Sequence, residues 1–325
     1  MNQIEIVKRS ARLVWHHRLL WLLGFLTALA ASLGTFGQEL RSVATSIPRL
    51  GELLSVPAAG SSPTQTGVNL AALGCCLLLG VVGGTIFMYL FRAALIRASD
   101  AIANQVGGEC TLTWREGIRL GWTGRTARLL VLELAIGVPV GIVTLLVLGV
   151  GAAPWLLLRA GVIHDQLVGI VVGVVVGLLA LIVLLGIFAA YTVLWQFWSR
   201  EVLLGDRSVG ESVFGGITLV REHLKDVAVM WLVMLGLRIT QLVLTLGFGI
   251  GTRSIAKLAI AVVLLTMSAG TLPALLGIVL LFVLADVPDS AVSGLYMGFQ
   301  MTVWSIVYRE VTGETLSPAS VIVEG

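Results

Sequence analysis

Long apolar runs dominate the chain, and polar residues are gathered into the shorter stretches between them. A helix needs about 20 apolar residues to cross the hydrocarbon core of a bilayer. Uninterrupted runs of about this length predict six transmembrane helices and an all-α integral membrane protein. The runs cover residues 19–37, 69–91, 129–150, 166–190, 227–250 and 290–308.

A further apolar stretch, residues 255–285, is interrupted by the segment 268–273. About 13 helical residues remain on each side, and at about 1.5 Å per residue neither half can span a bilayer alone. The stretch is therefore one long bent span, which gives seven spans, or a broken apolar hairpin that enters and leaves on the same side. We expect the hairpin, because the turn that follows, Asp286–Asp289, lacks Lys and Arg, as an external turn should.

Composition supports the membrane assignment. Hydrophobic residues make up 57% of the 325 residues and charged residues only 12%, and the mean hydropathy is +0.99. So many apolar side chains cannot be hidden in one globule surrounded by water. We expect residues 1–325 to form a single multi-pass membrane domain.

The distribution of Lys and Arg predicts the orientation, because these residues accumulate on the cytoplasmic side. Fourteen lie before the first run or in the second and fourth connections, and five lie in the alternate connections. This asymmetry predicts a cell (plasma) membrane protein with a cytoplasmic N-terminus. The basic residues lie close to span ends, so they are no signature of nucleic-acid binding.

The N-terminal run has a second interpretation. Basic residues precede it, and Ala28 and Ala30 form an A-x-A pattern that is typical of a signal-peptide cleavage site. The apolar run continues past Ala30, so we expect an uncleaved first span.

Two of the connections that we place in the cytoplasm contain a capping box, in which a Ser or Thr and a Glu three residues later satisfy each other's backbone N–H groups. The boxes are Thr113–Glu116 and Ser208–Glu211. Apolar residues follow each box at helical spacing, which predicts two amphipathic connector helices with this stripe towards lipid or towards the bundle. Ordinary short connecting helices are the alternative. The stripes are Trp114, Ile118 and Trp122, and Val209, Val213, Ile217, Val220 and Leu224.

The two boxes are 95 residues apart, and the same offset carries Gly121 onto Gly216. The offset also relates the second span to the fourth and the third to the fifth. We therefore predict two copies of span, connector helix and span, in residues 69–150 and 164–248. Spans two and four run in the same direction, so these copies are parallel repeats.

Small residues recur at the four-residue spacing that lets helix backbones approach closely in lipid. Gly294 and Gly298 form one such pair, and Gly169, Gly173 and Gly177 form a stripe in the fourth span. The stripe is either a seam between two copies of the chain or a contact within one bundle, and we expect the contact within the bundle.

Few polar side chains interrupt the apolar runs, and burying a charge in lipid costs about 2.5–3.5 kcal/mol on insertion scales. Glu133 lies one turn into the third run, and Arg238 and Gln241 lie near the middle of the fifth. Arg238 and Gln241 are three residues apart and share a helix face. We expect Arg238 to face the bundle interior and to pair with Glu133, or else to snorkel to the interface, border a wet cavity or bind a ligand.

The sequence shows no catalytic constellation. It contains no Walker A, H-E-x-x-H, G-x-S-x-G or dinucleotide-binding motif. Three cysteines, Cys75, Cys76 and Cys110, are too few and too dispersed for a metal site. We expect no enzyme activity, no cofactor and no metal.

Two segments carry a resemblance to a family. The stretches S-V-G-E-S-V-F-G-G-I-T-L-V at 208–220 and W-S-I-V-Y-R at 304–309 resemble bacterial multi-pass proteins similar to the membrane domain of some glycerophosphodiester phosphodiesterases. The resemblance implies a six-helix membrane module. The catalytic barrel of that family would need about 250 further residues, which the sequence does not contain.

These observations favour a non-enzymatic membrane module that scaffolds or docks a protein partner through the connector helices. A transporter or lipid-handling protein is the alternative, and a membrane-embedded enzyme ranks third. Besides the lipid bilayer, the sequence names no partner, and nothing in it decides for or against a homo-oligomer.

Overall fold

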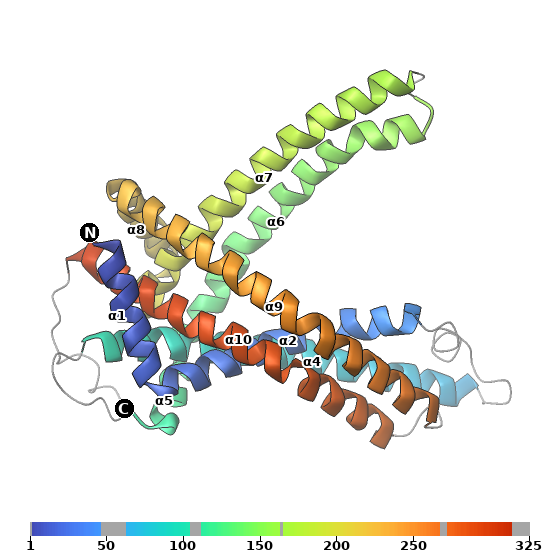
Figure 1. The fold of residues 1–325 in the computed structure, drawn as a ribbon, viewed down its shortest axis with the longest axis horizontal. Coiled ribbons are helices and arrows are strands. Elements are labelled where there is room, and N and C mark those ends of the chain that lie inside the picture. Colours follow the sequence, from blue (N-terminus) through green and yellow to red (C-terminus); the bar gives the residue numbers. More distant parts are fainter. Residues whose placement is uncertain (1, 47–62, 105–111, 163–164, 267–271, 314–325) are drawn as a thin grey trace. The chain divides into compact units, whose positions relative to one another are not determined.

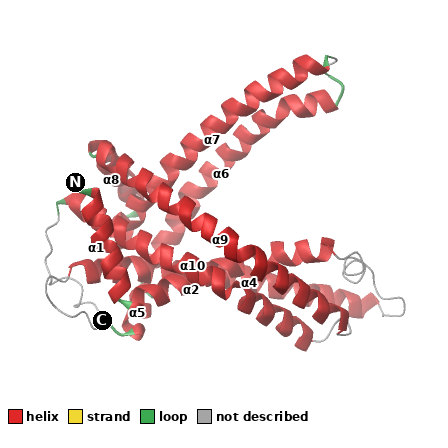
Figure 2. Ribbon diagram, viewed as in Figure 1, coloured by secondary structure: helices red, strands yellow, loops and turns green. Residues whose placement is uncertain are grey.

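A computed structural model describes residues 2–46, 63–104, 112–162, 165–266 and 272–313 (Figure 1). Within these ranges all regular structure is helical (Figure 2), as the sequence predicts. The helices are α1 Gln3–His16, α2 Arg18–Ser46, α4 Pro63–Asn104, α5 Trp114–Gly121, α6 Gly124–Arg159, α7 Gln166–Leu203, α8 Val209–Glu222, α9 Leu224–Thr266 and α10 Leu272–Thr312.

The predicted hairpin at 255–285 is not a separate element. α9 continues without interruption to Thr266, and α10 runs from Leu272 through the predicted turn to Thr312. Residues 255–266 are therefore the end of α9, and 272–285 are the start of α10. Residues 268–271, most of the interrupting segment 268–273, lie outside the described residues.

The acidic segment Asp286–Asp289 is helical, so its assignment as an external turn was wrong. It contains Pro288, which lies inside α10. A proline within a helix removes one backbone hydrogen bond and favours a kink, but it does not have to end the helix. Asp286 and Ser290 are both buried, and the Ser290 hydroxyl donates to Oδ2 of Asp286, one turn earlier in the same helix, at 3.3 Å.

Among the described residues, three helical segments are long and apolar enough to cross a membrane: α6, α7 and Leu224–Gly247 of α9. A fourth candidate is the pair formed by α1 and residues Arg18–Ser32 of α2, which is bent by 91°. Segments of this length and composition are those of a helical membrane protein.

α1 was not predicted as a separate helix. Asn2 caps its N-terminus, and Ile6, Ser10 and Val14 form its buried face. The indole N–H of Trp21 donates to the carbonyl of Val14 at 2.6 Å, across the bend between α1 and α2. The bend is therefore held by a hydrogen bond as well as by packing.

The chain divides into two compact units, and the first contains residues 1–123 and 232–325. In this unit α10 packs along α2 and α4. A β-carbon added to Gly24 of α2 would lie 2.2 Å from the carbonyl oxygen of Gly294 in α10, which is closer than any real contact. The Gly294–Gly298 pair therefore brings two backbones of the same unit close together, as the four-residue spacing of small residues predicts.

The second unit contains residues 124–231. Its long helices α6 and α7 lie side by side (Figure 1) and are joined by a short connection. A β-carbon added to Gly173 would lie 3.1 Å from the indole of Trp155 in α6. Gly173 of the Gly169–Gly177 stripe thus makes a contact within the unit, whereas nothing lies within 4 Å of a β-carbon added to Gly177.

Candidate functional site

Both predicted connector helices exist, and each begins at its capping box. In α5, the backbone N–H of Thr113 donates to Oε2 of Glu116 at 2.8 Å, and Glu116 returns a bond to the Thr113 hydroxyl. In α8, the backbone N–H of Ser208 donates to Oε2 of Glu211 at 3.0 Å, with the corresponding return bond. The boxes satisfy free N–H groups at both N-termini.

The same hydrogen bonds act on the two carboxyl groups. Bonds from the backbone and then the side chain of Thr113 lower the pKa of Glu116. For Glu211, the bond from the Ser208 side chain is the largest cause of the lowered pKa, followed by the Ser208 backbone. Both carboxylates therefore stay ionised at neutral pH and keep the boxes closed.

The packed face of α5 consists of glycines. Gly117 and Gly121 are its buried residues, and a β-carbon added to Gly121 would lie 2.3 Å from the carbonyl oxygen of Leu90 in α4. The apolar stripe points elsewhere, because Trp114 is exposed and Trp122 is 72% exposed. Backbone contact holds α5 on α4, and the indole rings of the stripe are left outside.

α8 also packs through a glycine, here against a side chain of the second unit. Its buried residues are Ser212, Gly216 and Val220, and a β-carbon added to Gly216 would lie 2.6 Å from Cδ1 of Trp198 in α7. Phe214, which the predicted stripe did not include, is 75% exposed. Each connector helix therefore has a buried glycine on its inner face and an exposed aromatic side chain nearby.

The equivalent glycines of the two predicted copies contact the preceding long helix at different positions along its sequence. Gly121 contacts Leu90, 31 positions before it, whereas Gly216 contacts Trp198, 18 positions before it. The order of long helix, capped short helix and long helix is present in both segments. The rotation that would superpose 69–150 on 164–248 stays a prediction.

Arg238, the arginine within the fifth apolar run, lies over an aromatic ring. Its Cζ is 5.4 Å from the ring centroid of Tyr296 in α10, and the Tyr296 hydroxyl donates to the carbonyl of Met234 at 3.3 Å. A guanidinium over a tyrosine face is stabilised by the ring's electron density. The ring thus supplies a partner for the cation that the sequence analysis did not anticipate.

Gln241 joins the same helix pair from a buried position. Its side-chain N–H₂ group donates to the hydroxyls of Ser293 in α10 and Thr245 in α9, each at 3.2 Å. We call Arg238, Gln241, Ser293 and Tyr296 the α9–α10 polar seam. All four residues belong to the first unit, and the seam connects its part of α9 to α10.

Glu133, the third predicted site residue, lies in α6 and so belongs to the second unit. It is half-buried. A β-carbon added to Gly137 would lie 3.9 Å from both Cγ of Glu133 and the hydroxyl of Tyr191, so these groups border the same space between α6 and α7. The pairing of Glu133 with Arg238 stays a prediction.

Buried charges at helix ends escaped the sequence analysis. In the first unit, Asp100 of α4 and Arg309 of α10 form an ion pair. In the second, Glu201 of α7 is fully buried and pairs with Arg207 at 3.0 Å. Partners separated by 209 positions, as Asp100 and Arg309 are, leave no local sequence signal.

The described residues contain no group of three or more His, Cys, Asp or Glu side chains arranged to hold a metal ion. The polar seam offers a cation, an amide and hydroxyls but no nucleophile paired with a base. Its chemistry is that of holding helices together or of binding an anion. Comparisons of the chain with protein-family models, curated proteins and solved structures give no match.

Proposed function

We propose that this protein is a non-enzymatic multi-pass membrane module that binds a protein partner through its two connector helices. The main support for this proposal is the way in which α5 and α8 pack against the long helices α4 and α7. Gly121 lies against α4 and Gly216 against α7, while Trp122 and Phe214 are exposed. Exposed aromatic side chains on rigidly held helices are typical anchors of protein interfaces.

The polar seam supports the same proposal. Its Gln241–Ser293 hydrogen bond and Arg238–Tyr296 stacking join α9 to α10. Polar side chains in membrane helices commonly serve as such helix contacts. Polar groups that could otherwise line a substrate path are thereby used in packing.

The proposed topology has the six long helices as six spans in the plasma membrane, with both described ends of the chain in the cytoplasm. The asymmetric distribution of Lys and Arg supports it. Two of the proposed spans precede α5 and four precede α8, so this topology places both connector helices on the same side as the N-terminus, the cytoplasmic side. The six-helix module implied by the resemblance to phosphodiesterase membrane domains agrees with this arrangement.

Photo-crosslinking in cell membranes tests the proposal. A photoreactive amino acid is placed at Trp122 or at Phe214, with Leu145 of α6, which is 69% exposed, as a control of matched exposure within a predicted span. The proposal expects discrete protein adducts from both connector positions and only lipid adducts from Leu145. Lipid adducts alone at Trp122 and Phe214 would contradict partner binding.

A transporter or lipid-handling role is the second candidate, and the exposure of Arg238 favours it. A cation held over Tyr296 can bind a phosphate or a carboxylate without rearrangement. Under this alternative, Arg238→Ala leaves the protein stable but removes a bound anionic lipid or substrate. Loss of stability without loss of ligand assigns Arg238 to packing.

A further inference from the structure

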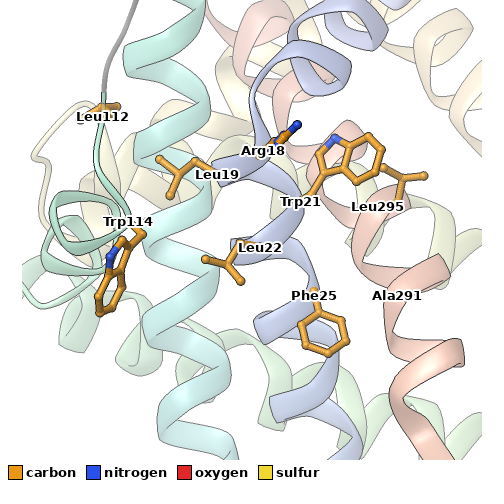
Figure 3. A pocket seen from close by; sticks show the side chains of 9 residues that line it. All are labelled: Arg18, Leu19, Trp21, Leu22, Phe25, Leu112, Trp114, Ala291 and Leu295. Atoms are coloured by element: carbon orange, nitrogen blue, oxygen red, sulfur yellow. The ribbon is translucent and has the colours of Figure 1, made fainter.

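An open groove in the first unit lies between α2, α10 and the start of α5 (Figure 3). Its volume is about 570 Å³, within the range of about 300–1,000 Å³ that is usual for ligand sites. The walls are apolar except at one end. They are formed by Arg18, Leu19, Trp21, Leu22, Phe25, Leu112, Trp114, Ala291 and Leu295.

We propose that this groove binds one anionic phospholipid of the bilayer, with the phosphate at Arg18 and an acyl chain along α2 and α10. This inference does not depend on the proposed docking of a protein partner. It rests on three features of the groove: its polarity along the helix axis, the charges at its rim and the fixed aromatic side chains of its wall.

The polarity follows the helix axis. Arg18 is the first residue of α2, and Leu22 and Phe25 follow about 6 and 10 Å further along it at about 1.5 Å per residue. Figure 3 shows Leu295 near the level of Trp21 and Ala291 near the level of Phe25. The groove therefore changes from charged to apolar over a distance that matches the passage from a lipid headgroup to its acyl chain.

The charge at the rim is complementary to a phosphate. Arg18 is exposed, and among the described residues that line the groove none is acidic. A second cation stands close by, because Cζ of Arg115 lies 5.4 Å from the ring centroid of Trp114. Guanidinium groups bind phosphate oxygens through paired N–H donors, and basic residues at a membrane boundary attract anionic lipids.

The aromatic wall is held in place. The indole N–H of Trp21 donates to the carbonyl of Val14, and the Trp15 and Trp21 rings form a T-shaped pair with 5.3 Å between their centroids. Trp21 also lines the groove and so offers apolar surface to an acyl chain. Indole rings at the boundary between water and lipid are typical of such positions.

Native mass spectrometry with equal amounts of phosphatidylglycerol and phosphatidylcholine tests the proposal. The wild-type protein in detergent is expected to retain phosphatidylglycerol preferentially. Arg18→Gln should reduce this preference at least about tenfold, which is the scale of one lost charge-assisted hydrogen bond. Arg18→Lys, which keeps the charge, should keep part of it. Ala291→Phe, which fills the apolar end, should reduce retention of both lipids.

The control is Arg12→Gln on α1, because Arg12 is exposed but does not line the groove. Its lipid preference should equal that of the wild type, and all variants are compared only if their unfolding temperatures in lipid-free detergent agree. An equal loss in Arg12→Gln would assign the preference to the basic surface as a whole. An unchanged preference in Arg18→Gln, or replacement of the lipid by a second copy of the chain, would overturn the site.

Discussion

Arg309 of α10 makes a bidentate ion pair with Asp100 of α4: its Nε donates to Oδ1, and its Nη2 donates to Oδ2 at 2.7 Å. The Asp100 side chain is only 5% exposed, and Asn104 donates a further hydrogen bond to Oδ2 at 3.2 Å. Removing one member of a buried ion pair leaves the charge of the other without compensation. The pair therefore fixes the C-terminal part of α4 to that of α10.

Removing either member of this pair should destabilise the protein strongly. Asp100→Asn and Arg309→Gln each leave a buried polar group without its partner, and we expect each to lower the free energy of unfolding by about 3–5 kcal/mol. The double variant should lose less than the sum. Unfolding in detergent measures the effect, and Arg128→Gln is the control, because its pair with Asp206 is half exposed and should contribute at most about 1 kcal/mol.

Additive losses in the double variant would show that Asp100 and Arg309 act independently.

The glycine contact between α2 and α10 gives a second prediction. Gly24→Ala would place a methyl group against the Gly294 carbonyl, which must push the helices apart and should cost about 1–3 kcal/mol. Gly236→Ala in α9 is the matched control, since nothing lies within 4 Å of its added β-carbon. The control should be neutral or slightly stabilising. Equal melting temperatures for the two variants would refute the close approach.

The pairing predicted for Glu133 and Arg238 is tested by a double-mutant cycle. If the pair forms, Glu133→Ala and Arg238→Ala each lower thermal stability, and the double variant recovers part of the loss. Tyr296→Leu removes the ring beneath Arg238 and should cost about 0.5–2 kcal/mol. Coupling of Arg238 to Tyr296 but not to Glu133 would assign the cation to the polar seam alone.

The capping box of α8 predicts a local effect with a defined pH dependence. Ser208→Ala should speed amide hydrogen exchange in the first turn of α8 and leave α5 unchanged. Folding lowers the pKa of Glu211. The ionised Glu211 carboxylate therefore contributes fully to the stability of α8 above the ordinary carboxyl pKa, and this contribution is lost as the pH falls through the lowered pKa. Unchanged exchange at Glu211 in Ser208→Ala would contradict this role.

Local sequence patterns predicted the connector helices, but they did not predict features that depend on packing between distant helices. A capping box joins residues three apart, so Thr113 and Glu116 could be paired from the sequence. The segment around Pro288 has the local signals of a turn, yet α10 continues through it while packed against α2 and α4. The hydrophobic pattern left open whether the tryptophan stripe of α5 faces lipid or the bundle. The buried residues are Gly117 and Gly121, which lie against the Leu19 side chain and the Leu90 carbonyl, and a pattern of apolar residues does not identify such glycine contacts.

The candidate site was predictable only in part. Arg238 and Gln241 stood out because polar residues are rare in apolar runs, but their partners Tyr296 and Ser293 lie on α10 and carry no sequence signal. α1 was overlooked because its basic residues were used only as evidence of orientation, although Ile6, Ser10 and Val14 follow a helical period.

The most direct test of the membrane module is the side of the membrane on which its connector helices lie. Single cysteines are labelled with a membrane-impermeant reagent, using native Cys110 before α5 and Phe214→Cys on α8 in a background without other cysteines. The topology predicts no labelling of either in intact cells and labelling of both after permeabilisation. Labelling of Cys110 or of the α8 cysteine in intact cells would contradict the cytoplasmic placement and the docking role built on it.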